Sequence, residues 1–170
     1  RRQAALAQVR QLGDPVLRTP AAAVTTFDQA LIDEVASMVS LMQQAHGVGL
    51  AAPQIGRLRR VIVIDPHEDE PPVALINPEI VWRSEDEEVG PEGCLSIGEI
   101  SVDVARAVSI RVRAQDLQGT GVELEAREFV ARVIQHEVDH LDGKLIIDFL
   151  SRLKRDMIVR RFRKMAREET

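Results

Sequence analysis

Two histidines and a glutamate lie close together in the stretch VIQHEVDH of this 170-residue chain. His136 and His140 are four residues apart, so on a helix both imidazoles project from one face, about one turn apart. Glu137 follows the first histidine directly. An unpaired ionised glutamate in an apolar groove costs on the order of several kcal/mol, and a bound metal ion removes that cost. The spacing therefore predicts a divalent metal site in which the ion acidifies a water and Glu137 accepts its proton.

A catalytic site of this type needs a third protein ligand and leaves one position open. No histidine follows His140, and the end of the chain offers only glutamates. Cys94, the only cysteine, lies upstream in the stretch EGCLSI, where Gly93 permits a tight turn beside the thiol. We therefore predict that Cys94, His136 and His140 bind one metal ion.

The stretch GVGLAAPQIG, residues 47–56, is a third candidate for the site. Small residues on both sides of Leu50 indicate a backbone that a ligand approaches closely. Gln54 supplies a neutral amide donor that suits a developing oxyanion. Taken alone, the stretch is equally consistent with a tight loop.

The remaining sequence predicts the elements that position these residues. Apolar positions at helical spacing predict helices over residues 27–45, 127–142 and 151–168, the first beginning at a capping box formed by residues 26–29. Between them, short β-branched runs predict antiparallel strands at 61–65, 73–82, 107–116 and 120–126. The expected fold class is α+β, with antiparallel or mixed sheets around a central helix that carries HExxH, plus N-terminal and C-terminal helices.

Periodicity also predicts which faces of two helices are buried. On the middle helix the expected polar side consists of Arg127, Glu128, Arg132, Gln135, Asp139 and Asp142. The expected apolar side consists of Ala126, Phe129, Val130, Val133, Ile134 and Leu141, together with the three HExxH residues. On the last helix the expected inward residues are Leu153, Met157, Ile158, Phe162 and Met165.

Length and composition indicate an ordinary globular chain that fits one domain, residues 1–170. The sequence is 45% hydrophobic and 29% charged and has no apolar run long enough to span a bilayer, so no membrane partner is expected. The N-terminus has no apolar run of signal-peptide length, and a single cysteine excludes an intrachain disulfide, so a reducing cytoplasm is expected rather than secretion. Of the net charge of −5, residues 151–170 carry +5 and the rest −10, which makes the last helix the one basic feature.

Together, GVGLAAPQIG, EGCLS and QHEVDHLDG, in this order and spacing, closely resemble the three motifs of the peptide deformylases. The stretch GDPVLRTPA is similar to the N-terminal segment of that family. The resemblance implies a hydrolase that removes the formyl group from N-formylmethionyl ends of nascent proteins and releases formate. It also implies an α+β fold with sheets around the HExxH helix, and a location in the bacterial cytoplasm or in a eukaryotic organelle.

The same resemblance implies roles for individual residues. The three predicted ligands would hold the metal, which would be Fe²⁺ in the cell, with Zn²⁺, Ni²⁺ or Co²⁺ as substitutes. Glu137 would be the general base and would later protonate the leaving amine. Gln54 and the backbone N–H of Leu95 would hold the oxyanion, while Val48 and Gly49 would line the site and bind the peptide backbone.

One position departs from the family pattern. Gly98 stands where the family usually has proline after EGCLS and a small apolar residue. The departure concerns the wall of the peptide groove, because glycine has the backbone freedom that proline would remove. We expect Gly98 to loosen that wall without affecting the metal ligands.

Two other classes of function remain open from the residues. Cys94 could be the nucleophile of a metal-free thiol hydrolase with a histidine base, which a chelator would not inhibit. The chain could also be a ribosome- or RNA-associated module with a structural metal, although such a site is closed by four protein ligands and only three are in evidence. In either an enzyme or a module, the basic C-terminal helix is expected to face ribosomal RNA, or else to be a solvated charged helix. No DNA partner is expected.

Overall fold

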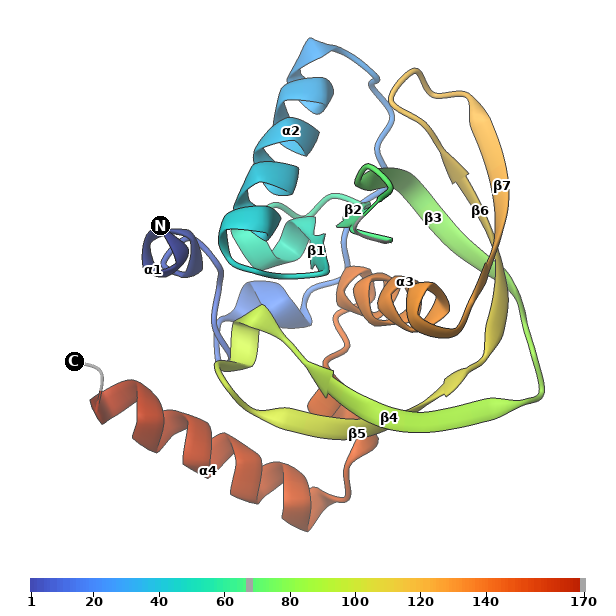
Figure 1. The fold of residues 1–170 in the computed structure, drawn as a ribbon. Coiled ribbons are helices and arrows are strands. Elements are labelled where there is room, and N and C mark those ends of the chain that lie inside the picture. Colours follow the sequence, from blue (N-terminus) through green and yellow to red (C-terminus); the bar gives the residue numbers. More distant parts are fainter. Residues whose placement is uncertain (67–68, 169–170) are drawn as a thin grey trace.

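The structure, a computed structural model, describes residues 1–66 and 69–168 and has two antiparallel sheets (Figure 1). The larger sheet has the strand order β1 (Gly49–Ala51), β2 (Val61–Ile64), β3 (Val73–Arg83), β6 (Ser109–Gln115) and β7 (Gly121–Arg127). The smaller sheet pairs β4 (Glu87–Gly93) with β5 (Ser101–Ala107). The helices are α1 (Arg2–Leu6), α2 (Gln29–Gln44), α3 (Glu128–Leu141) and α4 (Arg152–Glu168). Four short 3-10 helices complete the fold: η1 (Pro15–Arg18), η2 (Ala52–Ile55), η3 (Leu95–Ile97) and η4 (Ile146–Phe149).

Helix α3 lies in the interior, with the larger sheet on one side and the β4–β5 hairpin on the other (Figure 1). Strand β2 packs against other elements on both faces of the larger sheet, and all four of its residues are buried. Ile62 and Ile64 belong to the apolar cluster that contains α3, whereas Val61 and Val63 belong to the cluster that contains α2. Alternate side chains of one strand therefore contact two helices on opposite faces of the sheet.

The predicted α+β class is confirmed, and the three predicted helices and four predicted strands are present with shifts of a few residues at their ends. The predicted capping box is wrong. Helix α2 begins after Asp28, whose side chain accepts a hydrogen bond from the Leu31 N–H at 3.1 Å. Strands β1, β4 and β5 were not predicted. β1 has only three residues, and β4 (EEVGPEG) contains glycine and proline, so neither has a recognisable apolar pattern.

Some residues of α3 and α4 do not lie on the helix face that was predicted for them. On α3, Gln135 is buried rather than solvent-facing, because its side-chain amide makes two hydrogen bonds to the backbone of Ala107 on β5. Phe129, predicted to be inward, is 49% exposed. Helix α3 is enclosed on two sides, so its buried surface is wider than one apolar stripe.

On α4 the error has a geometric cause. Phe162 is buried and Ile158 packs against the third core cluster, as predicted. Leu153 and Met157 are 72% and 60% exposed, contrary to the prediction. Met157 is one residue before Ile158 and thus lies about 100° away around the helix axis. The apolar contacts of α4 with the third core cluster come from the narrower stripe that contains Ile158, Val159 and Phe162. Among the described residues no helix is long and apolar enough to cross a bilayer.

Candidate active site

The three predicted metal ligands converge from two parts of the chain. His136 and His140 project from α3, and Cys94 lies directly after β4, where the chain turns into η3. One ligand atom from each residue lies within 4.8 Å of the other two. The two Nε2 atoms are 3.2 Å apart, and Cys94 Sγ is 3.4 Å from His140 Nε2. Both histidines are almost fully buried, so the donors meet in the interior.

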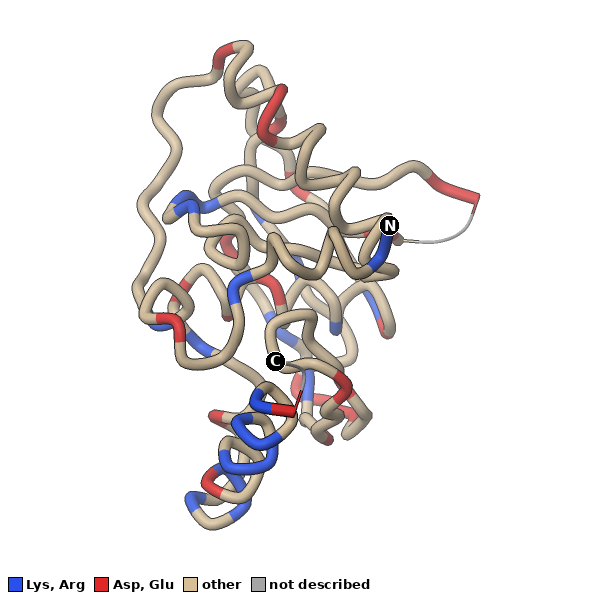
Figure 2. Tube along the Cα trace, turned by 90° about the vertical axis from the view of Figure 1, so that its left-hand side faces the viewer, with Lys and Arg blue, Asp and Glu red and all other residues tan. Residues whose placement is uncertain are grey.

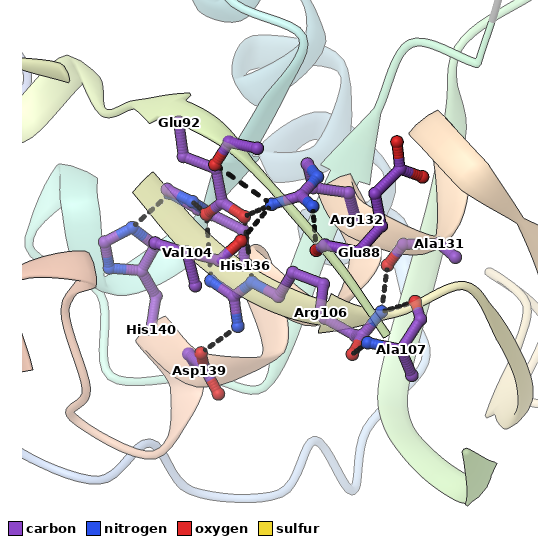
Figure 3. Close-up of polar contacts among 12 residues, drawn as sticks. Glu88, Glu92, Val104, Arg106, Ala107, Ala131, Arg132, His136, Asp139 and His140 are labelled. Carbon is purple, nitrogen blue, oxygen red and sulfur yellow. Dashed lines mark hydrogen bonds and ion pairs between the residues drawn. The ribbon is translucent and has the colours of Figure 1, made fainter. Parts of the chain in front are cut away.

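The donor set fits a divalent metal ion. His136 Nδ1 lies 2.9 Å from the carboxylate of Glu92, which leaves its Nε2 for a ligand and is the usual arrangement of a metal-binding histidine (Figure 3). His140 Nδ1 is buried and has no hydrogen-bond partner among the described residues. Two imidazoles and one thiolate suit a borderline metal such as zinc or iron, and three ligands leave a coordination position open.

Glu137 is completely enclosed beside these ligands. Its Oε1 is buried without a hydrogen-bond partner in the described part of the chain. Burial raises the pKa of Glu137 to about 7, and Glu92 adds to the effect while His136 opposes it. A carboxylate with a pKa near the working pH can both accept and return a proton.

Burial also acts on the two histidines, with opposite outcomes. Burial lowers the pKa of His136, but the charge of Glu137 and the hydrogen bonds to Cys94 and Glu92 outweigh burial and hold that pKa well above the ordinary value. Burial and the adjacent His136 lower the pKa of His140 well below the ordinary value.

Glu92 is the centre of a buried ion-pair network that was not predicted (Figure 3). Arg106 on β5 donates two hydrogen bonds of 2.9 Å to it, and Arg132 on α3 donates one of 2.7 Å. Burial raises the pKa of Glu92, but the hydrogen bonds from Arg106 and His136 outweigh burial and bring it down to about 2. Arg106 also bonds Asp139 at 2.6 Å, one residue before the second histidine. The network holds β4, β5 and α3 together around the ligands.

A pocket of about 320 Å³ opens onto this cluster. Seven of the eight predicted site residues line it, namely Val48, Gly49, Gln54, Cys94, Leu95, His136 and Glu137. His140, the eighth, contacts Cys94 and His136. His46, Phe129 and Arg132 also line the pocket and were not predicted as site residues. The structure therefore brings all predicted site residues to one place.

The side-chain amide of Gln54 has a fixed orientation. Its Oε1 accepts a hydrogen bond of 3.0 Å from the Ala51 N–H. Its Nε2 therefore points the other way, 3.1 Å from Ser96 Oγ and 3.6 Å from Cys94 Sγ. The donor end of the amide faces the pocket, where a negatively charged oxygen could accept from it.

Two glycines shape the pocket wall. A Cβ at Gly49 would lie 2.5 Å from Glu137 Oε2, so only glycine lets β1 approach the carboxylate this closely. Gly98 has φ of +66° and ψ of −136°. Proline fixes φ near −65°, so proline in place of Gly98 would require a different backbone course for this turn.

The fold and the donor set define a class: a metal-dependent hydrolase whose α+β scaffold carries HExxH on a central buried helix. The sequence profile of polypeptide deformylases matches residues 6–156. A peptide deformylase of Bartonella tribocorum is 45% identical, covering 93% of this chain and 92% of the relative. The chain therefore belongs to the polypeptide deformylase family.

Solved structures agree with this assignment. A peptide deformylase from Legionella pneumophila superimposes with a TM-score of 0.89 at 40% identity, covering 95% of each chain. The enzyme from Thermotoga maritima gives a TM-score of 0.81 at 48% identity, covering 84% of this chain and 96% of the other. The protein is thus a hydrolase that removes the formyl group from nascent formyl-Met peptides, in a metal-dependent family. This finding favours neither a metal-free thiol enzyme nor a binding module.

Replacing Arg106 with leucine should destabilise the fold and weaken metal binding. The substitution leaves the buried Glu92 with fewer partners, and breaking a buried ion pair in this way costs about 3–5 kcal/mol in the free energy of unfolding. Loss of a hydrogen-bonding group behind a metal ligand typically lowers metal affinity about 10- to 100-fold. Urea denaturation and metal titration measure the two effects.

Arg111→Leu is the matched control, since Arg111 is exposed on β6 of the larger sheet and lies over the Trp82 ring. It should cost less than about 1 kcal/mol. Equal destabilisation by the two substitutions would contradict the role given to the Glu92 network.

Proposed function

We propose that Cys94, His136 and His140 hold one divalent metal ion and that Glu137 is the general base of deformylation. The observation that carries the proposal is the convergence of three ligand atoms within 4.8 Å of one another, beside a buried carboxylate oxygen that has no hydrogen-bond partner among the described residues. A cation bound there would acidify a water molecule and polarise the formyl carbonyl group. The rest of the reaction depends on the protein's own side chains.

Glu137 accepts the proton of the attacking water and later delivers it to the leaving amine. Its raised pKa, about 7, suits both steps near neutral pH. Attack on the formyl carbon places a negative charge on the former carbonyl oxygen. The Gln54 Nε2 and the backbone N–H of Leu95 both border the pocket and would donate hydrogen bonds to that oxygen.

Val48 and Gly49 would hold the peptide substrate. Val48 is 47% exposed at the pocket wall, and Gly49 begins strand β1, which is an edge of the larger sheet. An edge strand offers backbone N–H and C=O groups to an extended peptide. The formyl group would then be directed toward Glu137, which lies against Gly49.

Glu137→Gln should keep the metal and lose turnover. The amide has nearly the same shape but cannot accept the proton, and loss of a general base typically lowers kcat about 10²- to 10⁴-fold. Formate release from a formyl-Met-Ala peptide and metal analysis on the same sample provide the test. Full activity in metal-replete Glu137→Gln protein would refute the role of Glu137.

We further propose that Fe²⁺ is the native ion. The support is the pairing of one thiolate with two imidazoles, a set that binds iron as well as zinc. Protein isolated without air should contain iron and lose activity on exposure to air, because a thiolate beside redox-active iron is readily oxidised, whereas zinc has no redox chemistry. Zinc at full occupancy in active, anaerobically isolated protein would overturn this assignment.

The ribosome is the second proposed partner, through α4. Lysines and arginines are densest along this helix (Figure 2). Residues 151–170 carry a net charge of +5, and the remainder of the chain carries −10, so contact with a polyanion is favourable only through α4. Phe162 anchors the helix to the third core cluster and leaves Arg160, Arg161 and Lys164 exposed.

Replacing Arg160, Arg161 and Lys164 with glutamine should weaken cosedimentation with ribosomes at low salt. Each lost phosphate contact lowers the salt slope of binding by about 0.7–0.9, so the slope should fall by roughly 2–3 if all three make contact. Hydrolysis of a short formyl peptide should stay unchanged. The matched control removes the same charge from the large sheet, by replacing Arg83, Arg111 and Arg113, and should leave binding intact. If the α4 variant cosediments with ribosomes as well as wild type does, the ribosome contact is wrong and α4 has only a structural role.

We also propose that residues 1–170 act as one catalytic domain in the cytoplasm, or in an organelle if the source is eukaryotic. The single-domain proposal is supported by the core cluster that contains Leu17, Ile97 and Phe162, which joins the last helix to residues from the beginning and the middle of the chain. The lone cysteine and the nascent substrate support the location. One cooperative calorimetric transition and immunolocalisation are the corresponding measurements.

A further inference from the structure

The segment of residues 9–12, which we call the brace, contacts both loops that carry the proposed oxyanion donors. It lies between α1 and η1, beside the turn that follows β4 (Figure 1). On one side the Arg10 N–H donates to the carbonyl of Gln54 at 2.6 Å. On the other side the Leu12 N–H donates to the carbonyl of Ser96 at 2.8 Å. The brace therefore sets the spacing between η2 and η3, which come from distant parts of the sequence.

The brace contacts η2 through both the backbone and the side chain of Arg10. Beyond the backbone hydrogen bond, the Arg10 side chain lies across Gly56, where an added Cβ would be 2.7 Å from Arg10 Nη2. Gly56 ends η2 with φ of +83°, two residues after Gln54. Arg10 is in turn paired with Asp14 at 3.3 Å. The loop that carries the Gln54 amide is thus fixed from behind, on the side away from the pocket.

The contact with η3 depends on one side chain. Gln11 Nε2 donates to the Leu95 carbonyl at 3.0 Å and to the Val9 carbonyl at 3.1 Å. The Cys94 carbonyl accepts from the Ile97 N–H at 3.0 Å within the turn itself. With Leu12 on Ser96, three consecutive carbonyls of this turn each have a donor. The Leu95 N–H belongs to the same peptide plane as the Cys94 carbonyl, and the Leu95 carbonyl belongs to the next plane, so holding both carbonyls fixes the backbone of Leu95 from its two sides and with it the direction of the Leu95 N–H.

We propose that Gln11 is a positioning residue for deformylation, because its side-chain amide holds the Leu95–Ser96 peptide and so keeps the backbone of Leu95 in the conformation in which the Leu95 N–H and Gln54 Nε2 meet the same oxygen. Gln11 does not line the pocket and acts through Leu95. The proposal rests on the oxyanion role proposed above for Leu95 and Gln54. An oxyanion site stabilises the transition state only if its donors are in place before the reaction, so a tilt of one donor lowers kcat. Gln11 hydrogen-bonds Val9 and Leu95 rather than β1, whose backbone would hold the peptide, so its loss should affect KM little.

Gln11→Leu tests the proposal, because leucine fills a similar space without a donor. Losing an oxyanion donor outright costs about 10²- to 10³-fold in kcat, so a displaced donor should cost less, about 5- to 20-fold. KM for a short formyl peptide and metal content should stay unchanged. Gln11→Lys, which keeps a donor of sufficient reach, should retain kcat within about threefold. Gln44→Leu, at an exposed glutamine of α2, is the matched control and should behave as wild type.

A binding comparison separates positioning from a general loss of structure. A peptide H-phosphonate mimics the tetrahedral intermediate, and a transition-state mimic should lose affinity in proportion to kcat. The deformylated product Met-Ala-Ser should bind Gln11→Leu and wild type equally. Unchanged kcat in metal-replete Gln11→Leu, or equal weakening of mimic and product, would overturn the role of Gln11. Gln54→Ala distinguishes failure of the oxyanion site from failure of the Gln11 role. If Gln54→Ala retains full kcat, the proposed oxyanion site is wrong. If Gln54→Ala loses about 100-fold in kcat while Gln11→Leu loses nothing, only the role of Gln11 is wrong.

Discussion

The buried carboxylate of Glu92 is the interaction on which the site depends. It accepts hydrogen bonds from Arg106 and Arg132 and lies 2.9 Å from His136 Nδ1, so a single group ties β4, β5 and α3 together. Buried charges of this kind are expensive unless each is paired, and here the pairing is complete enough to bring the pKa of Glu92 down to about 2. The carboxylate stays ionised at any pH at which the enzyme works. The orientation of His136 is therefore set by an ion-pair network rather than by packing alone.

The Glu92 network and the brace each hold different groups in place around the pocket. Glu92 orients His136, where Cys94 and the two histidines meet, and Gln11 holds the carbonyl of Leu95, the residue after Cys94. Each of these two groups controls the direction of another group in the site: Glu92 that of the His136 ring, and Gln11 that of the Leu95 backbone. Because β4 leads directly into Cys94 and η3, the same turn receives constraints from both. The arrangement explains how short loops can hold donors in fixed positions.

The sequence was sufficient to predict residues whose roles follow from local spacing. His136, Glu137 and His140 share one helical turn, and their convergence with Cys94 and Gln54 was expected from motif order. The ion pairs of Glu92 could not be predicted, because they depend on the register of β4 against β5, which places Glu92 opposite Val102. A signal was nonetheless present. Arg106 continues the buried alternation of Val102 and Val104, so a charged residue occupies an inward position of that strand. Such a residue requires a buried partner.

The close approach of β1 to the carboxylate has an evolutionary consequence. Gly49 adjoins both the proposed peptide-binding backbone and Glu137, with no room for a single methyl group between them. A substitution there that altered how a competing ligand sits in the pocket would also displace the carboxylate. A resistance substitution at Gly49, the position nearest to an inhibitor bound against β1, would therefore also impair catalysis. We expect resistance substitutions instead at exposed residues of the pocket wall, such as Val48, Phe129 and Gly98.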